Sequence, residues 1–328
     1  MGCRPDPRER GLIRRWLFVF LALTAGAARA APAHRIADLW YAHNATSIML
    51  GAADRLVVTT DSPSAQPWMY RLAPQLRRAT MVAASPVNVE ALLAAKVDLA
   101  IVGRPAEADH LKSLGVPAMA CRVVDLPSLR DCVDRTAAAL GDPVARKRAR
   151  AYDAYLDLVS ARLSRGLRGV SARARPRVLH LASLSPLRTD GGDTLIDDWI
   201  RRAGGRNAAA ELNGTLQPIS IEQIARWKPD IIIVGGQDQR AEDDPVAMVP
   251  ALKSYRILRN PSGAYQWDRH GPEFALQLLW TAKLLHPARF KDVDMAAETS
   301  RFYRRLFGYR MTPSEVASIL SASPPPAR

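Results

Sequence analysis

Two stretches of the chain, residues 88–103 and 220–235, align with each other without gaps and share one pattern. In both, a Glu stands at the third position, a Lys and an Asp precede an apolar run, and Ile-Val-Gly ends it. Ser220 and Gln223 fit a helix capping box. The apolar run at residues 231–234 shows no alternation, which indicates a strand buried on both faces. The repeat therefore predicts two units, each a short helix followed by a strand of a parallel sheet.

Each half of the chain also opens with alternating strands and helices. Residues 35–40 favour a strand, residues 44–51 a helix, and residues 55–60 a second strand. In the second half, residues 177–181 favour a strand, and residues 195–203 a helix that stops at two glycines. Because such an alternation occurs twice, we expect an α/β fold of two Rossmann-like lobes with mainly parallel sheets.

Between the halves, residues 142–165 combine helically spaced apolar residues with many arginines. Asp142 and Pro143 suit the N-cap and the first helical position. A helix of roughly twenty residues is about 30 Å long and can connect the lobes as a strut. In chain order we expect a signal peptide (1–30), an amino-terminal lobe (31–141), the connecting helix (142–166), a carboxyl-terminal lobe (167–320) and a flexible tail (321–328).

The amino terminus has the pattern of an export signal. Arg14 and Arg15 precede an apolar run over residues 16–23, and Ala28-Arg29-Ala30 resembles a cleavage site. The run is far shorter than the roughly 20 residues that a membrane-spanning helix needs, so a retained anchor is the less favoured alternative. We expect export to the periplasm with cleavage near Ala30. The choice between the general secretory and twin-arginine routes stays open.

The chain is basic, with 46 Lys and Arg against 32 Asp and Glu, a formal charge of +14. Removing residues 1–30, which hold six Arg and two acidic residues, leaves 40 − 30 = +10. Such a charge suits an anionic partner, whether nucleic acid, a membrane surface or an acidic small ligand. The arginines around residues 146–168 favour a solvated helix face over a contact with nucleic acid or lipid. Because the export signal is present and a recognition motif is not, we expect no binding to nucleic acid.

Signatures of catalysis are absent from the sequence. It contains no G-x-S-x-G elbow, no glycine-rich phosphate loop and no H-E-x-x-H helix. We therefore expect a binding protein without enzymatic activity and without a cofactor of its own. The six histidines show no pair at i, i+2 or i, i+4, which makes transport of a bare metal ion a less favoured function.

The mature chain would carry two cysteines, Cys121 at the end of an expected strand and Cys132 at the start of an expected helix. An oxidising compartment permits a disulfide between them. Strand and helix geometry could equally hold the two sulfurs apart. Both alternatives remain open.

Taken together, the chain resembles the substrate-binding proteins of ABC importers for iron–siderophores, haem and cobalamin, the class whose lobes are joined by one rigid helix (class III). The resemblance covers nearly the whole mature chain. It is carried by residues 42–57, 87–93 with Asp98, 219–234, 263–268 and 279–287. It implies a monomer that captures a small anionic metal chelate, in the first place an iron–siderophore complex, and delivers it to an inner-membrane permease. Haem, cobalamin and nickel chelates are the alternatives within the class.

In this class an acidic residue on each lobe pairs with arginines of the permease, and the matching positions are Glu90 and Glu222. Both are expected in the first turn of a helix, where the helix dipole stabilises a carboxylate by about 0.3–1 kcal/mol. That stabilisation alone would also explain a Glu there. Their equivalent places in the two repeats favour permease docking.

Ligands of open parallel sheets bind beyond the carboxyl ends of the strands. Aromatic and cationic side chains near those ends suit a bulky anionic ligand. The candidate ligand-binding residues are Trp40, Tyr41, His43, Trp68, Arg104, Arg188, Gln237, Tyr265 and Trp267. A Trp near a strand end is also often a core residue, and His43 is either an axial ligand to haem iron or a hydrogen-bonded loop histidine.

Overall fold

The computed structural model describes residues 1–2, 32–235 and 245–327. Most of the expected signal peptide, its cleavage site near Ala30, and Gln237 lie outside the described residues. The fold is that of the compact unit formed by residues 31–328. No helix among the described residues has the length and apolar composition to cross a membrane.

The amino-terminal lobe contains a five-stranded sheet in the order β3-β2-β1-β4-β5, in which every neighbouring pair is parallel. The strands are β1 (Ile36–Asp38), β2 (Leu56–Thr59), β3 (Thr80–Met81), β4 (Leu99–Val102) and β5 (Ala118–Ala120). The helices that alternate with them are α1 (Tyr41–Met49), α2 (Pro67–Leu72), α3 (Val89–Ala94), α4 (Pro105–Ser113) and α5 (Leu126–Leu140).

Helix α1 begins earlier than predicted. It starts at Tyr41 with Trp40 as the N-cap residue, so the prediction of a start at Asn44 is wrong. The Asn44 side chain instead donates a hydrogen bond of 3.2 Å to the Asp38 carbonyl oxygen. A buried amide that finds a partner at the preceding strand end is satisfied inside the helix, where it does not act as a cap.

The carboxyl-terminal lobe contains a six-stranded mixed sheet in the order β11-β10-β6-β7-β9, with β8 paired to β6. Its strands are β6 (Arg177–Leu184), β7 (Leu187–Thr189), β8 (Arg206–Asn207), β9 (Gln217–Pro218), β10 (Ile231–Val234) and β11 (Ile257–Arg259). Only the β6–β7 and β7–β9 pairs are antiparallel. The helices are α7 (Leu195–Arg202), α8 (Ile221–Trp227), α9 (Pro245–Met248), α10 (Phe274–Leu285), α11 (Met295–Phe302) and α12 (Pro313–Leu320), and a π-helical turn continues α11.

The repeated sequence unit forms the same structure in both lobes. Helices α3 and α8 each lead through a tight turn into a fully buried strand, β4 and β10. The Asn88 side chain caps α3, and Ser220 forms the predicted capping box with Gln223. At the turn, Lys96 and Lys228 both adopt a left-handed backbone conformation, with φ of 49° and 47°. The duplication inferred from the sequence is therefore confirmed in the backbone.

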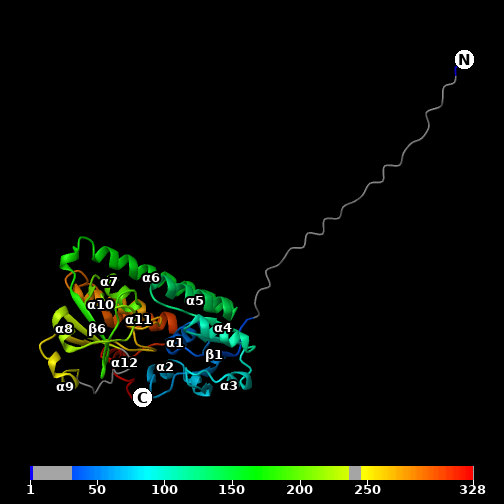
Figure 1. Ribbon diagram of the computed structural model, residues 1–328, viewed down its shortest axis with the longest axis horizontal. Coiled ribbons are helices and arrows are strands. Elements are labelled where there is room, and N and C mark those ends of the chain that lie inside the picture. Colours follow the sequence, from blue (N-terminus) through cyan, green and yellow to red (C-terminus); the bar gives the residue numbers. More distant parts are fainter. Residues whose placement is uncertain (3–31, 236–244, 328) are drawn as a thin grey trace. The chain divides into compact units, whose positions relative to one another are not determined.

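One long helix, α6 (Pro143–Gly166), connects the lobes and runs along both halves of the molecule (Figure 1). The Asp142 side chain caps it by accepting a 2.7 Å hydrogen bond from the Ala145 N–H, and Arg55 holds the same carboxylate at 2.7 Å. At 24 residues the helix is about 36 Å long. The predicted fold class, an α/β fold of two Rossmann-like lobes joined by one long helix, is confirmed.

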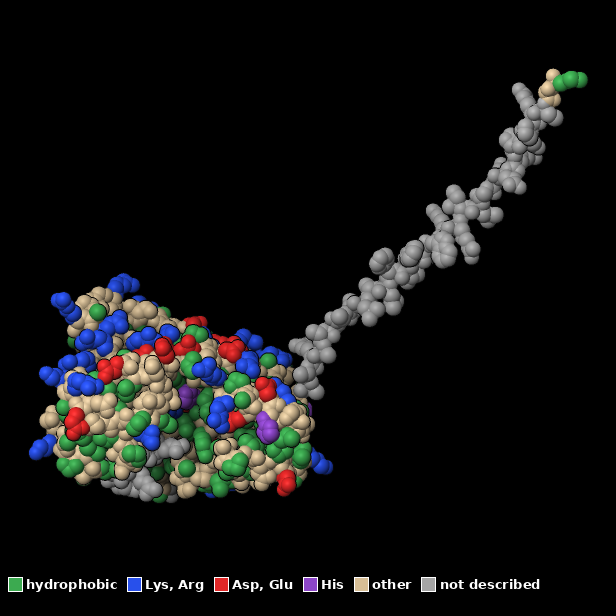
Figure 2. All heavy atoms as spheres, viewed as in Figure 1, with side chains coloured by type: hydrophobic (Ala, Val, Ile, Leu, Met, Phe, Trp, Pro, Cys, Tyr) green, Lys and Arg blue, Asp and Glu red, His purple; other side chains and the backbone are tan. Residues whose placement is uncertain are grey.

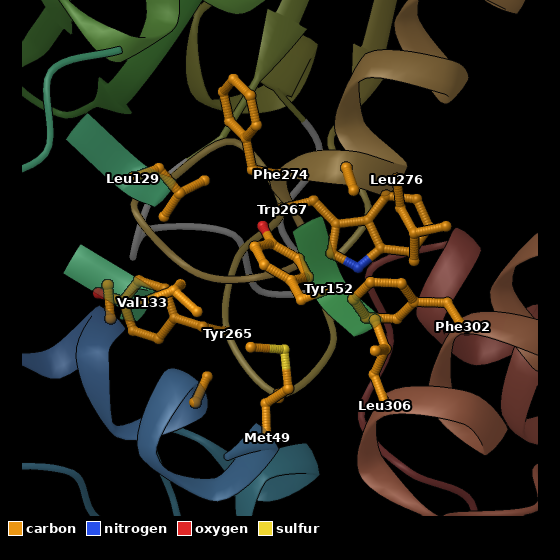
Figure 3. Close-up of a cluster of buried hydrophobic side chains, with 14 of the residues drawn as sticks. Met49, Leu129, Val133, Tyr152, Tyr265, Trp267, Phe274, Leu276, Phe302 and Leu306 are labelled. Atoms are coloured by element: carbon orange, nitrogen blue, oxygen red, sulfur yellow. The ribbon is translucent and has the colours of Figure 1, made fainter. Parts of the chain in front are cut away.

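A continuous hydrophobic cluster fills the space between the lobes under α6. Figure 3 shows Met49 of α1, Tyr152 of α6, Trp267 of the β11–α10 loop and Phe302 of α11 converging on it. Two smaller clusters cover the opposite faces of the two sheets. Since cores resist deformation, a shared core of this size opposes wide opening of the lobes.

The carboxyl terminus returns to the amino-terminal lobe, where it ends beside α2 (Figure 1). The Trp68 Nε1 of α2 donates a 2.9 Å hydrogen bond to the Ser323 carbonyl oxygen. Arg71 contacts Glu315 of α12 at 3.9 Å and donates a hydrogen bond to the Pro326 carbonyl oxygen. Residues 321–327, expected as a tail, thus make a second connection between the lobes.

Candidate ligand-binding site

Two adjoining cavities lie between the lobes, with volumes of about 530 Å³ and 370 Å³. Both are lined by Trp40, Tyr41, Thr215 and His270. Figure 2 shows the hollow between the two halves and the hydrophobic side chains along it. The two cavities form one cleft whose walls come from both lobes.

The cleft lies at the carboxyl ends of the strands, as expected for open parallel sheets. Trp40 follows β1, and Gly103 and Arg104 follow β4. From the other lobe, Ser183 lies near the end of β6, and residues 265–270 belong to the loop after β11. The fold thus brings segments distant in sequence to one cleft.

Trp40 is held in a fixed orientation at the centre of the cleft. Its ring stacks on His43 at a centroid distance of 6.2 Å and lies 5.3 Å from the His270 ring. On a third side it packs against Gly103, where an added Cβ would come within 3.3 Å of the indole. An indole fixed in this way offers a preorganised apolar surface to a ligand.

Two arginines bring positive charge to the larger cavity. Arg104 is 71% exposed and bound to Glu107, a hydrogen-bonded carboxylate that raises the pKa of the guanidinium. Arg122, two residues after the end of β5, is exposed and has no ion-pair partner among the described residues. Arg122 is therefore the cation that is free to pair with an anionic ligand.

His270 lines both cavities and is neutral at physiological pH. Burial, assisted by the neighbouring charge of Arg269, lowers the pKa of His270 to about 4. Its ring nitrogens make no hydrogen bond within the part of the chain that the structure describes. A neutral imidazole with a free nitrogen is a good metal ligand, and the Tyr41 phenol, 36% exposed, lines the same cavities.

Behind the smaller cavity lies a buried network of four ionisable groups. His180 contacts Asp190 at 3.1 Å and Asp268 at 2.8 Å, and Arg269 contacts Asp190 at 3.2 Å. Burial alone would lower the pKa of His180, but its hydrogen bonds to both carboxylates outweigh burial and raise it. Burial would raise the pKa of Asp190, but the charge of Arg269 and the hydrogen bond to His180 leave it below its ordinary value. The network thus pairs His180 and Arg269 with two carboxyl groups, and it fixes Arg269 as a wall of the cleft.

Four of the predicted ligand-binding residues lie in the cleft: Trp40, Tyr41, Arg104 and Tyr265. Arg188, on β7, lies outside the lining. Its Nη1 donates a 2.8 Å hydrogen bond to the carbonyl oxygen of Leu216, which lines the smaller cavity. Asp190 accepts the Leu216 N–H at 3.1 Å, so the two side chains hold Leu216 at its positive φ of 55°.

Three other predicted residues point into the protein interior and are not part of this site. His43 is buried on α1, where it binds Asp38 and Thr136. Trp68 is buried under the carboxyl terminus. Trp267 is fully buried in the shared core (Figure 3). Trp267 lies in a loop after a strand as predicted, whereas His43 and Trp68 belong to α1 and α2. All three side chains are directed inward, where their burial stabilises the fold.

The sequence did not predict four residues of the cleft: Arg122, Thr215, Arg269 and His270. Arg122 is the neighbour of Cys121 at the end of an expected strand, so the strand-end rule could have found it. Arg269 and His270 belong to the loop that also contains Tyr265, but their orientation depends on the Asp190–Asp268 network. Thr215 comes from a loop without a recognisable pattern.

The two glutamates of the repeat occupy equivalent positions. Glu90 lies in the first turn of α3 and Glu222 in the first turn of α8, and both are exposed. Neither forms an ion pair with a described residue. A hydrogen bond from Ser220 lowers the pKa of Glu222, which keeps it ionised.

Comparisons with known proteins agree with this architecture. The sequence profile of a family described as "Periplasmic binding protein" matches residues 36–261. The molybdate-binding protein MolA of Haemophilus influenzae is 27% identical over 278 residues, 75% of this chain and 78% of that protein. A vitamin B12-binding protein of Yersinia pestis is 26% identical over 259 residues, covering 77% and 84% of the two chains. The crystal structure of a periplasmic solute-binding protein from Veillonella parvula superposes with a TM-score of 0.70 at 25% identity, over 89% of this chain and 93% of that one.

Proposed function

The chain belongs to the periplasmic binding protein family, and on that premise we propose that it is the exported solute-binding component of an ABC importer for an anionic metal chelate, in the first place a ferric siderophore. The observation that carries the proposal is the composition of the cleft: a fixed indole, an unpaired arginine and a neutral imidazole on shared walls. It binds its ligand and performs no chemistry on it.

The size and lining of the cleft support a chelate over a small ion. Its two cavities, about 530 Å³ and 370 Å³, are in the range that accommodates drug-sized ligands. Trp40 and Tyr265 would pack against the organic part of the chelate, and Arg122 would pair with its negative charge. Because His270 is neutral, it does not have to lose a proton before it binds a metal ion at a coordination position that the chelate leaves open.

Haem, cobalamin and nickel chelates are the alternatives of the same class. A vitamin B12-binding protein among the relatives supports cobalamin, and the neutral His270 is compatible with an axial bond to haem iron. The relative MolA is named for molybdate, and Arg122 could pair with an oxyanion. A single tetrahedral oxyanion would leave most of the cleft empty, which favours the larger ligands.

Delivery to the permease would use Glu90 and Glu222. They are exposed, form no ion pair with a described residue and are equivalent by the internal repeat, so they could contact two related subunits of a permease. The connecting helix and the shared core restrict the lobes to small rotations. We therefore expect the distance between Glu90 and Glu222 to be nearly the same in the ligand-free and the ligand-bound protein.

A thermal-shift panel tests the assignment. Ferric catecholate and hydroxamate chelates, haemin, cobalamin, nickel with histidine, molybdate and free Fe³⁺ are each added to the protein. A ligand at 100 times its Kd stabilises the folded state by about 2.7 kcal/mol, which raises the melting temperature by roughly 5 °C. Stabilisation by a ferric chelate, with quenching of Trp fluorescence, supports the proposal. Stabilisation by molybdate alone, or by none of the compounds, refutes it.

A further inference from the structure

A second group of potential metal ligands lies outside the cleft, in the interior of the amino-terminal lobe. His43 on α1, Cys121 directly after β5 and Cys132 on α5 each offer one ligand atom, and these three atoms lie within 4.8 Å of one another. All three side chains are buried, with at most 2% exposure. Both cysteines are free thiols. Three separate elements thus direct one nitrogen and two sulfurs to a single point.

Asp38 orients the histidine toward the sulfurs. Its Oδ2 accepts a hydrogen bond of 2.7 Å from His43 Nδ1, and the Ser47 hydroxyl donates to the same oxygen. This leaves Nε2 on the side of the thiols, 3.0 Å from the Thr136 hydroxyl. A histidine that binds a metal through one nitrogen and a carboxylate through the other is the usual arrangement at zinc sites.

An acidic side chain lies beside the three ligand atoms. Asp38 is fully buried and contacts His43 at 2.7 Å, and an acidic group in the lobe interior favours a cation nearby. Oδ1 of Asp38 has no hydrogen-bond partner among the described residues.

A catalytic role does not fit this geometry. The order Cys–His–Asp is that of a nucleophile, its base and an orienting group. However, the Cys121 side chain is fully buried, so no substrate can reach its sulfur. Ligation needs no such access, because a buried ion can be acquired while the chain folds.

We propose that His43, Cys121 and Cys132 form a structural zinc site, distinct from the ligand cleft. Zinc prefers thiolate sulfur and imidazole nitrogen in a tetrahedral arrangement. The Thr136 hydroxyl contacts both His43 and Cys121, at 3.0 Å and 3.9 Å, and is a candidate for the fourth position. Zinc binds sulfur as thiolate, so the two thiols lose two protons for each Zn²⁺ bound.

The first test uses the full chain with Cys3→Ser, so that Cys121 and Cys132 are its only thiols. The protein is unfolded in reductant and chelator, freed of both, and refolded with Zn²⁺ or with Co²⁺ as a spectroscopic probe. We expect one ion per chain, release of two protons per ion, and a thiolate-to-cobalt charge-transfer band with the intense visible bands of tetrahedral Co²⁺. If the refolded chain binds no ion, or gives the weak cobalt spectrum of an oxygen-ligated site, the proposal is refuted. This measurement does not depend on any variant folding.

The second test asks which residues and which redox state hold the ion. We expect loss of the charge-transfer band, or binding of less than one ion per chain, in the variants Cys121→Ser, Cys132→Ser and His43→Gln. The variant His110→Gln, at an exposed histidine on α4, should keep the band and bind one ion per chain. Asp38→Asn should weaken zinc affinity by about 10–100-fold, as expected for a group that orients a ligand. Protein from the periplasm, isolated without reductant and alkylated under denaturing conditions, should contain zinc and two free thiols. A Cys121–Cys132 disulfide in that sample overturns the proposal.

Discussion

Glu273 is a buried carboxyl group on which the shape of the cleft depends. It is fully buried, and its Oε1 accepts hydrogen bonds from the Tyr303 hydroxyl at 2.9 Å and from the Tyr265 N–H at 3.2 Å. Because Tyr265 lines the smaller cavity, Glu273 supports one wall of the cleft. Its Oε2 has no hydrogen-bond partner among the described residues.

Burial outweighs these hydrogen bonds and raises the pKa of Glu273 from 4.5 to about 7. The folded protein thus binds a proton more tightly than the unfolded chain, so ionisation of Glu273 opposes folding. Its cost is absent below pH 4.5, grows as the pH rises and is complete above pH 7. A shift of about 2.5 pKa units corresponds to about 3.4 kcal/mol in total, of which about 2.5 kcal/mol develops between pH 5 and pH 8.

The substitution Glu273→Gln removes this cost and keeps an acceptor oxygen for Tyr303 and Tyr265. The quantity to compare is the unfolding free energy of the variant minus that of the natural protein. We expect this difference to be about 2–3 kcal/mol larger at pH 8 than at pH 5. Urea unfolding of both proteins, followed by Trp fluorescence at half-unit pH intervals, gives the difference directly. Other titrating groups, such as Asp61 and His180, are common to both proteins and cancel.

Any fixed cost of the amide at Oε2 shifts the two curves by the same amount at every pH. The pH dependence of the difference is therefore the decisive quantity. Glu90→Gln, at an exposed glutamate of α3, is the matched control and should change the difference by less than about 0.5 kcal/mol. An equal offset for Glu273→Gln at pH 5 and pH 8 would show that Glu273 is ionised in the fold at both, and the reasoning would fail.

Three further predictions concern binding and delivery. Trp40→Ala should weaken binding of the cognate chelate by at least about tenfold and reduce the quenching of fluorescence in titrations, because the fixed indole is lost. Arg122→Ala should weaken binding of the chelate and make its affinity less dependent on salt concentration. The control Arg146→Ala on α6 should leave both quantities unchanged. Equal effects of the two substitutions would mean that only the net charge of the protein matters. Glu90→Ala combined with Glu222→Ala should leave the Kd of the purified protein unchanged and reduce chelate uptake by cells, and undiminished uptake would argue against docking through these residues.

The sequence predicted the features of the fold that depend on local pattern. Short-range preferences predict the capping residues Ser220 and Asp142, the continuous strand at Ile231–Val234 and the long helix from Pro143, and the structure has each of them. Local pattern also located the strand ends at which the cleft lies. The antiparallel strands β7 and β9 were missed, because each has only two or three residues.

The orientation of side chains at the strand ends could not be predicted in the same way. Trp40 and Trp267 both lie in loops after strands, but one lines the cleft and the other fills the core. What distinguishes them is the packing of α6, α10 and α11, which are distant in sequence. The same reason explains why His270 and not His43 lines the cleft. Asp38 and Thr136 bind His43 in the interior, whereas His270 has no such partner among the described residues.

The two connections between the lobes determine how the cleft can work. α6 spans one side, and on another the carboxyl terminus holds α2 through Trp68 and Arg71. Between them lies a shared core that includes Met49 and Trp267. Opening the lobes widely would expose this core to water, which costs a free energy of about 25 cal/mol for each Å² of apolar surface. It would also break the hydrogen bond of Trp68. The binding energy of a ligand is therefore not needed to assemble the cleft, and selectivity has to come from the shape and charge that Trp40, Arg122 and His270 already present to it.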